Sequence, residues 1–293
     1  MAEAALNLGV HQSEDLETYA AAVIPFLEAE PSRRNVLRSI IEIGRQGTGA
    51  WRSSPSYWWV TDGDRVVGAA LCTPPWSLLV SSLPAAAIPA FVDRVAADAR
   101  GRGWRLNGVT GPRRDADAVA ALLGAALHVD RGEPRVLLLH ELRSVRDVSH
   151  PEGASRRAEA RDAQLVATWL RAFAAELDMP GAEAEASAVP VRIETGEYDL
   201  WEVDATPVSM ANHTVPLAGV VRIGGVYTPP EQRLRGYARR LVAEVSTAAL
   251  RLPQVSRCML YTEATNPVSN AIYRQIGYAA VEEHADIRFA WAA

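Results

Sequence analysis

The hydrophobic positions of this chain fall into short β-branched runs and longer helical stripes that follow one another in a repeated order. Residues 219–226 form one such run, which two prolines close, and this is typical of a buried strand. Over residues 238–250 the apolar side chains recur every three or four positions, which predicts an amphipathic helix. With the other elements assigned in the same way, each half of the chain has the order α α β β β α β α β.

In the N-terminal half, two-residue periodicity and helical stripes alternate in blocks. The predicted helices cover residues 14–28, 33–45, 84–100 and 115–127. The predicted strands cover residues 57–61, 65–72, 76–81, 104–110 and 135–142. We expect Ser13 to cap the first helix and Pro25 to kink or end it early. Asp62 and Gly63 stand between two strands and are a strong hairpin signal.

The C-terminal half repeats this order. The predicted helices cover residues 158–177, 180–188, 238–250 and 267–276. The predicted strands cover residues 198–203, 208–213, 219–226, 257–262 and 278–290. The polar stretch before them, with Pro151 and Gly153, is typical of a linker. We therefore predict a domain at residues 1–145, a linker at 146–157 and a second domain at 158–293.

The composition is that of an ordinary soluble protein, with 48% hydrophobic and 22% charged residues over 293 positions. We find no apolar stretch long enough to span a bilayer and no signal-peptide pattern at the N-terminus. A cytoplasmic location without membrane association is the expectation. Cys72 and Cys258 stand far apart in predicted strands, so we expect two buried free thiols.

All 30 basic residues are arginine, and this absence of lysine excludes several kinds of chemistry. Schiff-base catalysis and a Walker-type phosphate loop both need a lysine amine. A net charge of −5 with scattered arginines argues against nucleic acid as the partner. The six histidines show no metal-ligand spacing with cysteine or carboxylate, so we expect no metal site.

A strand-to-helix turn carries Arg233-Leu234-Arg235-Gly236-Tyr237-Ala238. The first backbone N–H groups of a helix have no intrahelical acceptors and lie at the positive end of the helix dipole. Such a turn is suited to bind an anion, and phosphate in particular. The plainer alternative is an ordinary connection with solvated arginines.

This hexapeptide resembles the Q/R-x-x-G-x-G/A pattern by which the GNAT N-acetyltransferase superfamily holds the pyrophosphate of acetyl-CoA. A typical member has glycine where this chain has Leu234. The resemblance implies an α/β fold of two tandem GNAT-like domains, each a mixed, mostly antiparallel sheet flanked by helices. The N-terminal domain is degenerate in this reading, because its Arg100-Gly-Arg-Gly103 ends a helix and is typical of a C-cap.

Gly224 and Gly225 interrupt the strand that leads to this turn. Glycine weakens a strand, but it is expected at a β-bulge or where a ligand packs on the backbone. The resemblance implies that this strand bulges and splays from the next parallel strand, and that Val226, Tyr227 and Thr228 bond the pantetheine arm of acetyl-CoA. The alternative is that the glycines make space for a neighbouring bulky side chain.

A second segment, residues 266–278, resembles the family pattern N-x-x-A/S-x-x-x-Y-x-x-x-G-F/Y. Asn266 is a good N-cap and Gly277 ends the predicted helix. The resemblance implies that Asn266 bonds the pantetheine, with Asn270 on the Tyr273 side of the helix. It assigns Tyr273 as the acid that protonates the departing thiolate; the alternative is that Tyr273 is part of the core.

The general base is less well defined by the sequence. The family often uses a glutamate on the central strand, but residues 219–228 contain no acid. Glu263 and Glu202 are the candidates, and the alternative for each is a solvated or salt-bridged carboxylate. An amine that arrives neutral requires no strong base.

The sequence thus predicts direct transfer of an acetyl group from acetyl-CoA to a primary amine. A small amine, an aminoglycoside, a peptide N-terminus and a protein lysine all stay open as acceptors, as does assembly into a homodimer. Two other classes are compatible with parts of the pattern. One is a non-catalytic acyl-CoA sensor, and the other is a scaffold whose N-terminal half binds a protein.

Overall fold

The structure, a computed structural model, describes residues 6–47, 54–179 and 181–292 and divides into two compact units. The first unit comprises the described residues up to Leu139 together with Glu263–Thr265 and the residues from Glu282 onward. The second comprises the described residues of His140–Thr262 and Asn266–Val281. Each unit is described by itself below.

The sheet of the first unit has one parallel pair among antiparallel ones. Its strands follow the spatial order β1 (Leu8–Ser13), β2 (Ser56–Asp62), β3 (Arg65–Cys72), β4 (Leu78–Val80), β5 (Gly108–Pro112) and β13 (Ala279–Ala290). Only β4 and β5 run parallel in this series. A two-residue strand, β6 (Asp130–Arg131), pairs with the end of β13.

Helices cover both faces of this sheet. One core contains residues of α1 (Leu16–Ala29) and α2 (Asn35–Arg45), such as Tyr19 and Ile41, packed against strand residues such as Tyr57. The other core contains residues of η1 (Ala85–Ala87), α3 (Ile88–Gly101) and α4 (Arg113–Leu127), packed against Trp58 and Ile287. The alternation of strand side chains between two apolar faces therefore gives the two cores.

The sheet of the second unit is built in the same way. Its strands follow the order β8 (Ala154–Arg157), β9 (Tyr198–Val203), β10 (Thr206–His213), β11 (Val220–Tyr227), β12 (Arg257–Glu263) and the end of β7 (Arg135–Leu142). The pairs from β8 to β11 are antiparallel, and β11 runs parallel to β12. This is the mixed, mostly antiparallel sheet that the sequence predicted.

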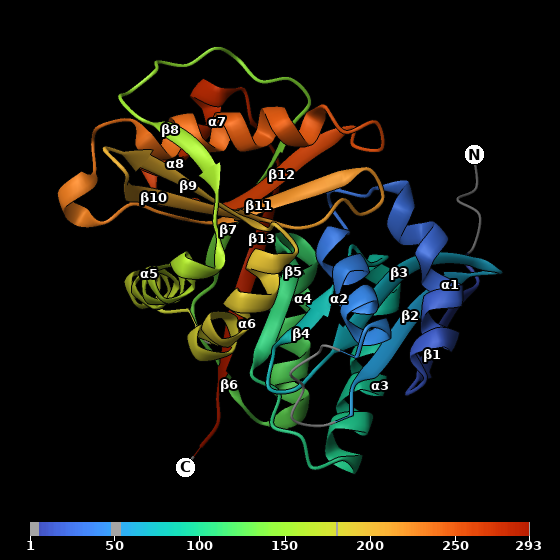
Figure 1. Cartoon of the computed structure of the whole chain (residues 1–293). Coiled ribbons are helices and arrows are strands. Elements are labelled where there is room, and N and C mark those ends of the chain that lie inside the picture. The colour runs from blue at the N-terminus through green and yellow to red at the C-terminus, as the bar shows by residue number, and fades with distance from the viewer. Residues whose placement is uncertain (1–5, 48–53, 180, 293) are drawn as a thin grey trace. The chain divides into compact units, whose positions relative to one another are not determined.

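Two pairs of helices flank the second sheet. Figure 1 shows α5 (Ala163–Glu176) and α6 (Ala182–Glu194) on one side of β9 and β10 and α7 (Tyr237–Leu250) on the other. η2 (Ala160–Asp162) leads into α5, and α8 (Pro267–Ile276) packs with α7. The helices α7 and α8 share one core with β11, and α5 and α6 share the other with β9.

The expected linker and domain limits differ from the structure. Residues 146–157 include β8, whose Arg156 pairs with Leu200 of β9. A short polar strand at a sheet edge shows no apolar alternation, so the sequence pattern does not reveal it. The expected C-terminal domain, 158–293, also does not stay in one unit, because the twelve-residue β13 continues past Val281 and its later residues pair with β5.

Details of the N-terminal elements also differ from the prediction. The N-cap of α1 is Asp15, whose Oδ2 accepts from the Thr18 N–H at 2.7 Å, while Ser13 ends β1. Pro25 does not end α1, which continues to Ala29 because buried residues on both sides of the proline pack into the core. The sequence analysis missed β1, since polar residues interrupt its apolar pattern.

Candidate functional site

The central feature of the second unit is the separation of two parallel strands. β11 pairs with β12 only over Val220–Arg222, opposite Arg257–Met259. The remaining five residues of β11, up to Tyr227, have no such pairing with β12. The strand therefore leaves its neighbour midway, as the resemblance implies.

A β-bulge coincides with this separation. Met210 of β10 pairs with Tyr227 and Asn212 pairs with Gly224, so a two-residue step on β10 faces a three-residue step on β11. Gly225 has φ +52°, and a Cβ there would lie 2.3 Å from Asn212 Nδ2. Both expectations for the glycine pair are therefore met: the strand bulges, and glycine leaves space for a side chain, that of Asn212.

Polar contacts hold the end of β11. The Ser209 hydroxyl is fully buried; it donates to the Tyr227 carbonyl at 3.1 Å and lies 2.9 Å from Thr228 Oγ1. The Tyr227 ring packs against Trp169, with ring centroids 6.2 Å apart. The carbonyls of Tyr227 and Thr228 already have protein partners, so the pantetheine bonds expected at Val226, Tyr227 and Thr228 stay a prediction.

The turn before α7 leaves the start of the helix open. Gly236, at φ +84°, is the N-cap of α7 and makes no side-chain capping bond. The N–H groups of Tyr237 and Ala238 are in the first turn and have no intrahelical acceptors. The Tyr237 ring itself is buried in the core. Leu234 is fully exposed at φ +65°, a left-handed conformation that favours glycine, which explains why glycine is typical at this position.

The arginines of the turn differ in how they are held. Arg233 donates from Nε to the Thr228 carbonyl at 2.9 Å and from its terminal nitrogen to Glu176 Oε1 at 2.6 Å. Arg235 is exposed and forms no ion pair with any residue that the structure describes. Arg235 is thus the arginine of the hexapeptide best placed to meet a ligand phosphate.

A further arginine, Arg239, was not singled out from the sequence. Its terminal nitrogen lies 3.3 Å from the position that a Cβ on Gly236 would take. Gln275 accepts from Arg239 at 2.5 Å, and Ser149 accepts from its other terminal nitrogen. A Cβ at position 236 would require this guanidinium to shift by a few tenths of an ångström, so the positive φ is the stronger reason for glycine there.

Helix α8 has the limits that the sequence predicted. Asn266 is its N-cap, with Oδ1 accepting from the Ser269 N–H at 3.0 Å, and Gly277 ends it at φ +116°. Because Oδ1 caps the helix, a bond from Asn266 to a ligand would come from its amide nitrogen.

Asn270 belongs to a buried polar chain. Its Oδ1 accepts from the Thr262 hydroxyl at 2.5 Å, and Thr262 Oγ1 lies 3.0 Å from His140 Nε2. Burial lowers the pKa of His140, so its ring is neutral at neutral pH. With the proton on Nε2, donation runs from His140 through Thr262 to Asn270. The sequence reasoning missed this chain, because it joins two strands and a helix.

Tyr273 lies in the core between two other rings. It is 8% exposed, with ring centroids 5.9 Å from Tyr278 and 6.4 Å from His140. Burial raises the pKa of Tyr273 well above its ordinary value, so the hydroxyl is protonated at neutral pH. That is the state a proton donor needs, and the packing is also that of a core residue.

The two candidate bases are both ion-paired. Glu263, in the first unit, accepts from Arg135 Nε at 2.6 Å. Glu202, on β9, accepts from Arg156 Nε at 2.8 Å, and β10 lies between its strand and β11. These contacts correspond to the salt-bridged alternative, and the assignment of either glutamate as a base stays a prediction.

Other predicted features can be compared directly. Cys72 and Cys258 are buried free thiols, as predicted, and burial raises the pKa of each to about 12. The described ranges contain no group of three or more His, Cys, Asp or Glu side chains that could hold a metal ion. Within the same ranges, no helix combines the length and the apolar character needed to cross a membrane.

Comparison with known proteins agrees with this architecture. Residues 203–287 match the family model described as FR47-like protein. No curated protein matches the sequence. A GCN5-related N-acetyltransferase from Sphaerobacter thermophilus is 16% identical, with a TM-score of 0.60 over 97% of this chain and 95% of its own.

Two further solved structures cover the whole length. A tandem GNAT protein from the clavulanic acid biosynthesis pathway is 14% identical, with a TM-score of 0.58 over 97% of this chain and 98% of its own. A GNAT-family acetyltransferase from Colwellia psychrerythraea is 9% identical, with a TM-score of 0.57 over 97% and 100%. At these identities the likeness shows the fold. The tandem GNAT fold is therefore confirmed. The family-model match, which covers residues 203–287, agrees with this fold.

Proposed function

We propose that this protein transfers an acetyl group from acetyl-CoA directly to the primary amine of a small molecule or a peptide. The GNAT fold supports an acyltransferase function in general terms. The observation that carries the finer proposal is the bulged strand β11, which leaves β12 after Arg222 and leads to the open start of α7 at Gly236.

The residues present fit the donor that we propose. The αL conformation of Gly236 and the uncapped first turn of α7 offer backbone N–H groups to a pyrophosphate, with Arg235 exposed beside them. The backbone of β11 beyond Arg222 offers hydrogen-bonding groups to an extended amide chain such as pantetheine. Asn266, at the start of α8, supplies an amide nitrogen.

The chemistry follows from the thioester that acetyl-CoA supplies. The acceptor nitrogen forms a bond to the carbonyl carbon, the carbon–sulfur bond breaks, and its electron pair stays on sulfur. Tyr273 then donates its hydroxyl proton to that sulfur and regains a proton, through water, from the acylated nitrogen. We propose that the acceptor amine reaches the site neutral, so that ion-paired Glu263 and Glu202 need not act.

One observation favours a second candidate, a non-catalytic acyl-CoA sensor. Tyr273 packs in the same core as Tyr278 and Ile276, and the described residues give its hydroxyl no hydrogen-bond partner. A sensor would keep the turn at Gly236 and would have no use for the hydroxyl. The two candidates therefore differ in what removal of a single oxygen atom does.

The test is Tyr273→Phe, with Tyr278→Phe as the matched control. A panel of small amines, aminoglycosides and peptides, followed by release of coenzyme A thiol, first identifies a working acceptor. Tyr273→Phe should then lower the chemical rate by roughly 10² to 10⁴, the usual value of a positioned general acid. Coenzyme A affinity should not change. The thiol of coenzyme A has a pKa of about 8.5, so its thiolate is a fair leaving group even without a proton donor. The fall in rate can therefore lie at the lower end of that range.

The control removes a hydroxyl from a ring that packs edge-on against Tyr273. Tyr278 hydrogen-bonds Ser246 at 2.9 Å, so its replacement costs stability but should leave the rate within about threefold of wild type. Equal rates for wild type and Tyr273→Phe would show that Tyr273 is a core residue and not the general acid. A panel in which no amine is acylated, although coenzyme A binds, would favour the sensor.

A further inference from the structure

A cavity of about 1000 Å³ lies within the second unit. Its lining comes from residues 143–147, from α7 from Arg240 onward, from β8 and β9, and from the end of β10 and the loop after it. A volume of this size is at the upper end of the range for small-molecule sites. None of the residues assigned to acetyl-CoA lines it.

The cavity runs along α7, and one of its ends is far from the donor turn. Val221, at the start of β11, lines the cavity, whereas Tyr227 at the other end of the strand leads into the turn. Helix α7 begins at the turn and lines the cavity from Arg240 to its end, and Leu252 continues the lining beyond the helix. Arg240 is one helical turn from Gly236, whereas Arg251 and Leu252 lie about 20 Å further along the axis, so only the far end of the cavity is distant from the donor turn.

The lining combines an apolar floor with a charged wall. Ala243, Val245 and Ala249 of α7 are buried, and Leu252 is 41% exposed. Five arginines line the same space, against three carboxylates. These arginines are Arg143, Arg146, Arg157, Arg240 and Arg251. The carboxylates are Asp147, Asp199 and Glu244. The lining therefore has two more positive than negative side chains.

The ion pairs show which arginines carry this excess of positive charge. Arg240 pairs with Glu244 at 2.8 Å, and Arg157 lies 3.5 Å from Asp199. Arg146 and Arg251, by contrast, are exposed and form no ion pair with any residue in the described part of the chain. Positive charges gathered around a concave, partly apolar surface attract anions more strongly than the same charges on a flat surface.

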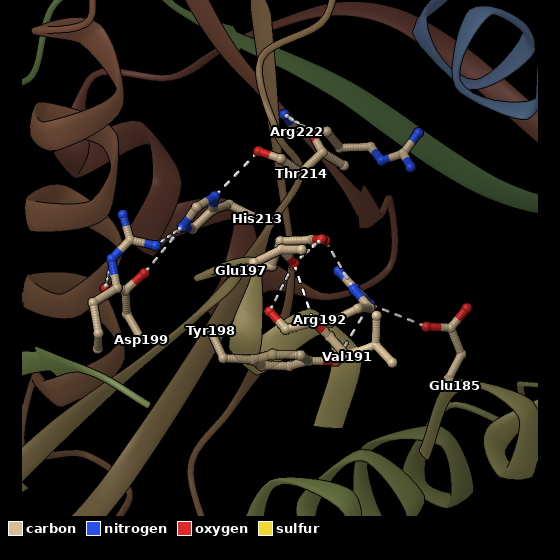
Figure 2. Close-up of polar contacts among 11 residues, drawn as sticks. Glu185, Val191, Arg192, Glu197, Tyr198, Asp199, His213, Thr214 and Arg222 are labelled. Atoms are coloured by element: carbon tan, nitrogen blue, oxygen red, sulfur yellow. Dashed lines mark hydrogen bonds and ion pairs between the residues drawn. The ribbon is translucent and has the colours of Figure 1, made fainter. Parts of the chain in front are cut away.

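One wall of the cavity is held by a polar network that does not depend on a ligand. Figure 2 shows His213 between Asp199 and Thr214: Nδ1 lies 3.1 Å from the Thr214 carbonyl and Nε2 lies 3.3 Å from Asp199 Oδ2. Arg157 approaches the same ring at 2.8 Å. The backbone N–H of His213 donates at 2.9 Å to the carbonyl of Glu197, the residue before β9. The wall is therefore ordered in advance.

We propose that this cavity binds a small organic anion, whose apolar body lies on α7 and whose carboxylate, phosphate or sulfonate group pairs with the arginines of the lining that have no ion-pair partner in the described ranges, Arg146 at one wall and Arg251 at the far end of α7. None of the residues assigned to acetyl-CoA lines the cavity, and the proposal does not depend on that assignment. The apolar floor and the two guanidiniums without a carboxylate partner among the described residues, of which that of Arg146 donates only to the Arg274 carbonyl at 3.5 Å, together define the class of ligand: an amphipathic anion, rather than a free inorganic ion or a neutral hydrophobe.

The test uses two dyes that differ in a single group. 8-Anilinonaphthalene-1-sulfonate carries the ring system and the sulfonate, and N-phenyl-1-naphthylamine carries the same rings without the charge. Fluorescence titration of the full chain should show one saturable sulfonate site per chain. The neutral dye should bind at least tenfold more weakly. Equal affinity for the two dyes would overturn the anionic class of ligand.

Matched double variants locate the site. Arg146→Glu with Arg251→Glu should weaken binding of the sulfonate dye at least tenfold. Arg65→Glu with Arg161→Glu changes the net charge equally, at exposed positions outside the cavity, and should leave binding within twofold. Circular dichroism of both variants checks the fold. Equal effects of the two variants, or displacement of the dye by coenzyme A, would place the dye elsewhere and refute the proposal.

Discussion

Each unit contains a strand, a helix and a parallel strand in succession, and the two copies differ where a ligand would lie. In the second unit β11 separates from β12 after Arg222. In the first unit β4 pairs with β5 at Leu78 and Leu79 and ends one residue later. A Cβ on Gly111 of β5 would lie 2.4 Å from the Val80 carbonyl oxygen, so the backbones of this pair are in contact up to the end of the strand.

The turns after the two strands differ as well. In the second unit Gly236 opens α7 without a side-chain cap. In the first unit the N–H of Leu83 donates to Asp115 Oδ1 at 3.2 Å, and Pro84 precedes η1. In the first unit, a carboxylate of the protein itself thus accepts the hydrogen bond from a backbone N–H of the turn. The fold thus supplies a strand and a helix in both units, while a few residues decide whether an anion can approach the turn between them.

The strongest test of this difference is Gly236→Glu. A carboxylate and a side chain would then stand where a pyrophosphate must approach the backbone, so coenzyme A affinity should fall by roughly 10²-fold or more. Gly103→Glu is the matched control, since Gly103 has φ +64° and open space around it. Isothermal titration should show one coenzyme A per chain for wild type and for the control. Two per chain, or unchanged affinity in Gly236→Glu, would contradict the assignment and the comparison.

Gly225→Val tests the bulge that accompanies the separation of β11. A β-branched residue at φ +52°, with its Cβ 2.3 Å from Asn212 Nδ2, should cost about 1–3 kcal/mol of unfolding free energy. Coenzyme A affinity should fall with it. Gly224→Val is the control, because that glycine has no positive φ and a Cβ added to it would lie 3.3 Å from Asn212 Oδ1. Urea unfolding measures the free energy of unfolding of both variants. Equal losses of stability would show that Gly225 is not needed for the conformation of the bulge.

Leu234→Gly should restore what the family pattern has at this position. Leucine at φ +65° carries about 1–2 kcal/mol of strain, and the extra freedom of glycine in the unfolded chain offsets part of it. The melting temperature should therefore rise by no more than ~3 °C. Differential scanning calorimetry measures the change. A lower melting temperature would mean that the Leu234 side chain stabilises the folded state by more than its backbone conformation costs.

Asp115→Asn concerns the turn of the first unit and should have the smallest effect. Burial raises the pKa of Asp115, so its ionised form lowers the stability of the folded state at neutral pH, and the penalty disappears as the pH falls below that pKa. Asparagine still accepts from the Leu83 N–H. The variant should melt up to ~2 °C higher at pH 7 and equally near pH 4. An advantage that does not depend on pH would exclude titration of Asp115 as its cause.

Elements with local end signals were predicted best from the sequence. Helix α8 has the predicted limits, because Asn266 caps it, Pro267 suits its first position and Gly277 ends it. β8 was missed, since its only distinction is pairing with a strand some forty residues later. Pro25 was misjudged because core packing on both sides of it offsets the missing hydrogen bond.

The residues of the candidate site also differ in how well the sequence predicted them. Gly225 was found because glycine is unexpected inside a strand, and Gly236 because it fits the strand–turn–helix pattern; the structure gives both a positive φ. Asn212 and Ser209 were not found, because their roles depend on the register between β10 and β11, which no local pattern specifies. The signal that was available in the sequence is a serine between Val208 and Met210, inside an apolar run that precedes the glycine pair.

The path of β13 affects how the protein can be divided for experiments. Its residues His284–Arg288 pair with Gly108–Pro112, far away in the N-terminal half of the sequence. A C-terminal fragment that begins at residue 158 would leave that stretch of backbone donors and acceptors without a partner strand. Exposed edges of this kind recruit other chains, so such a fragment should self-associate, or exchange strands between copies, at the concentrations used for purification.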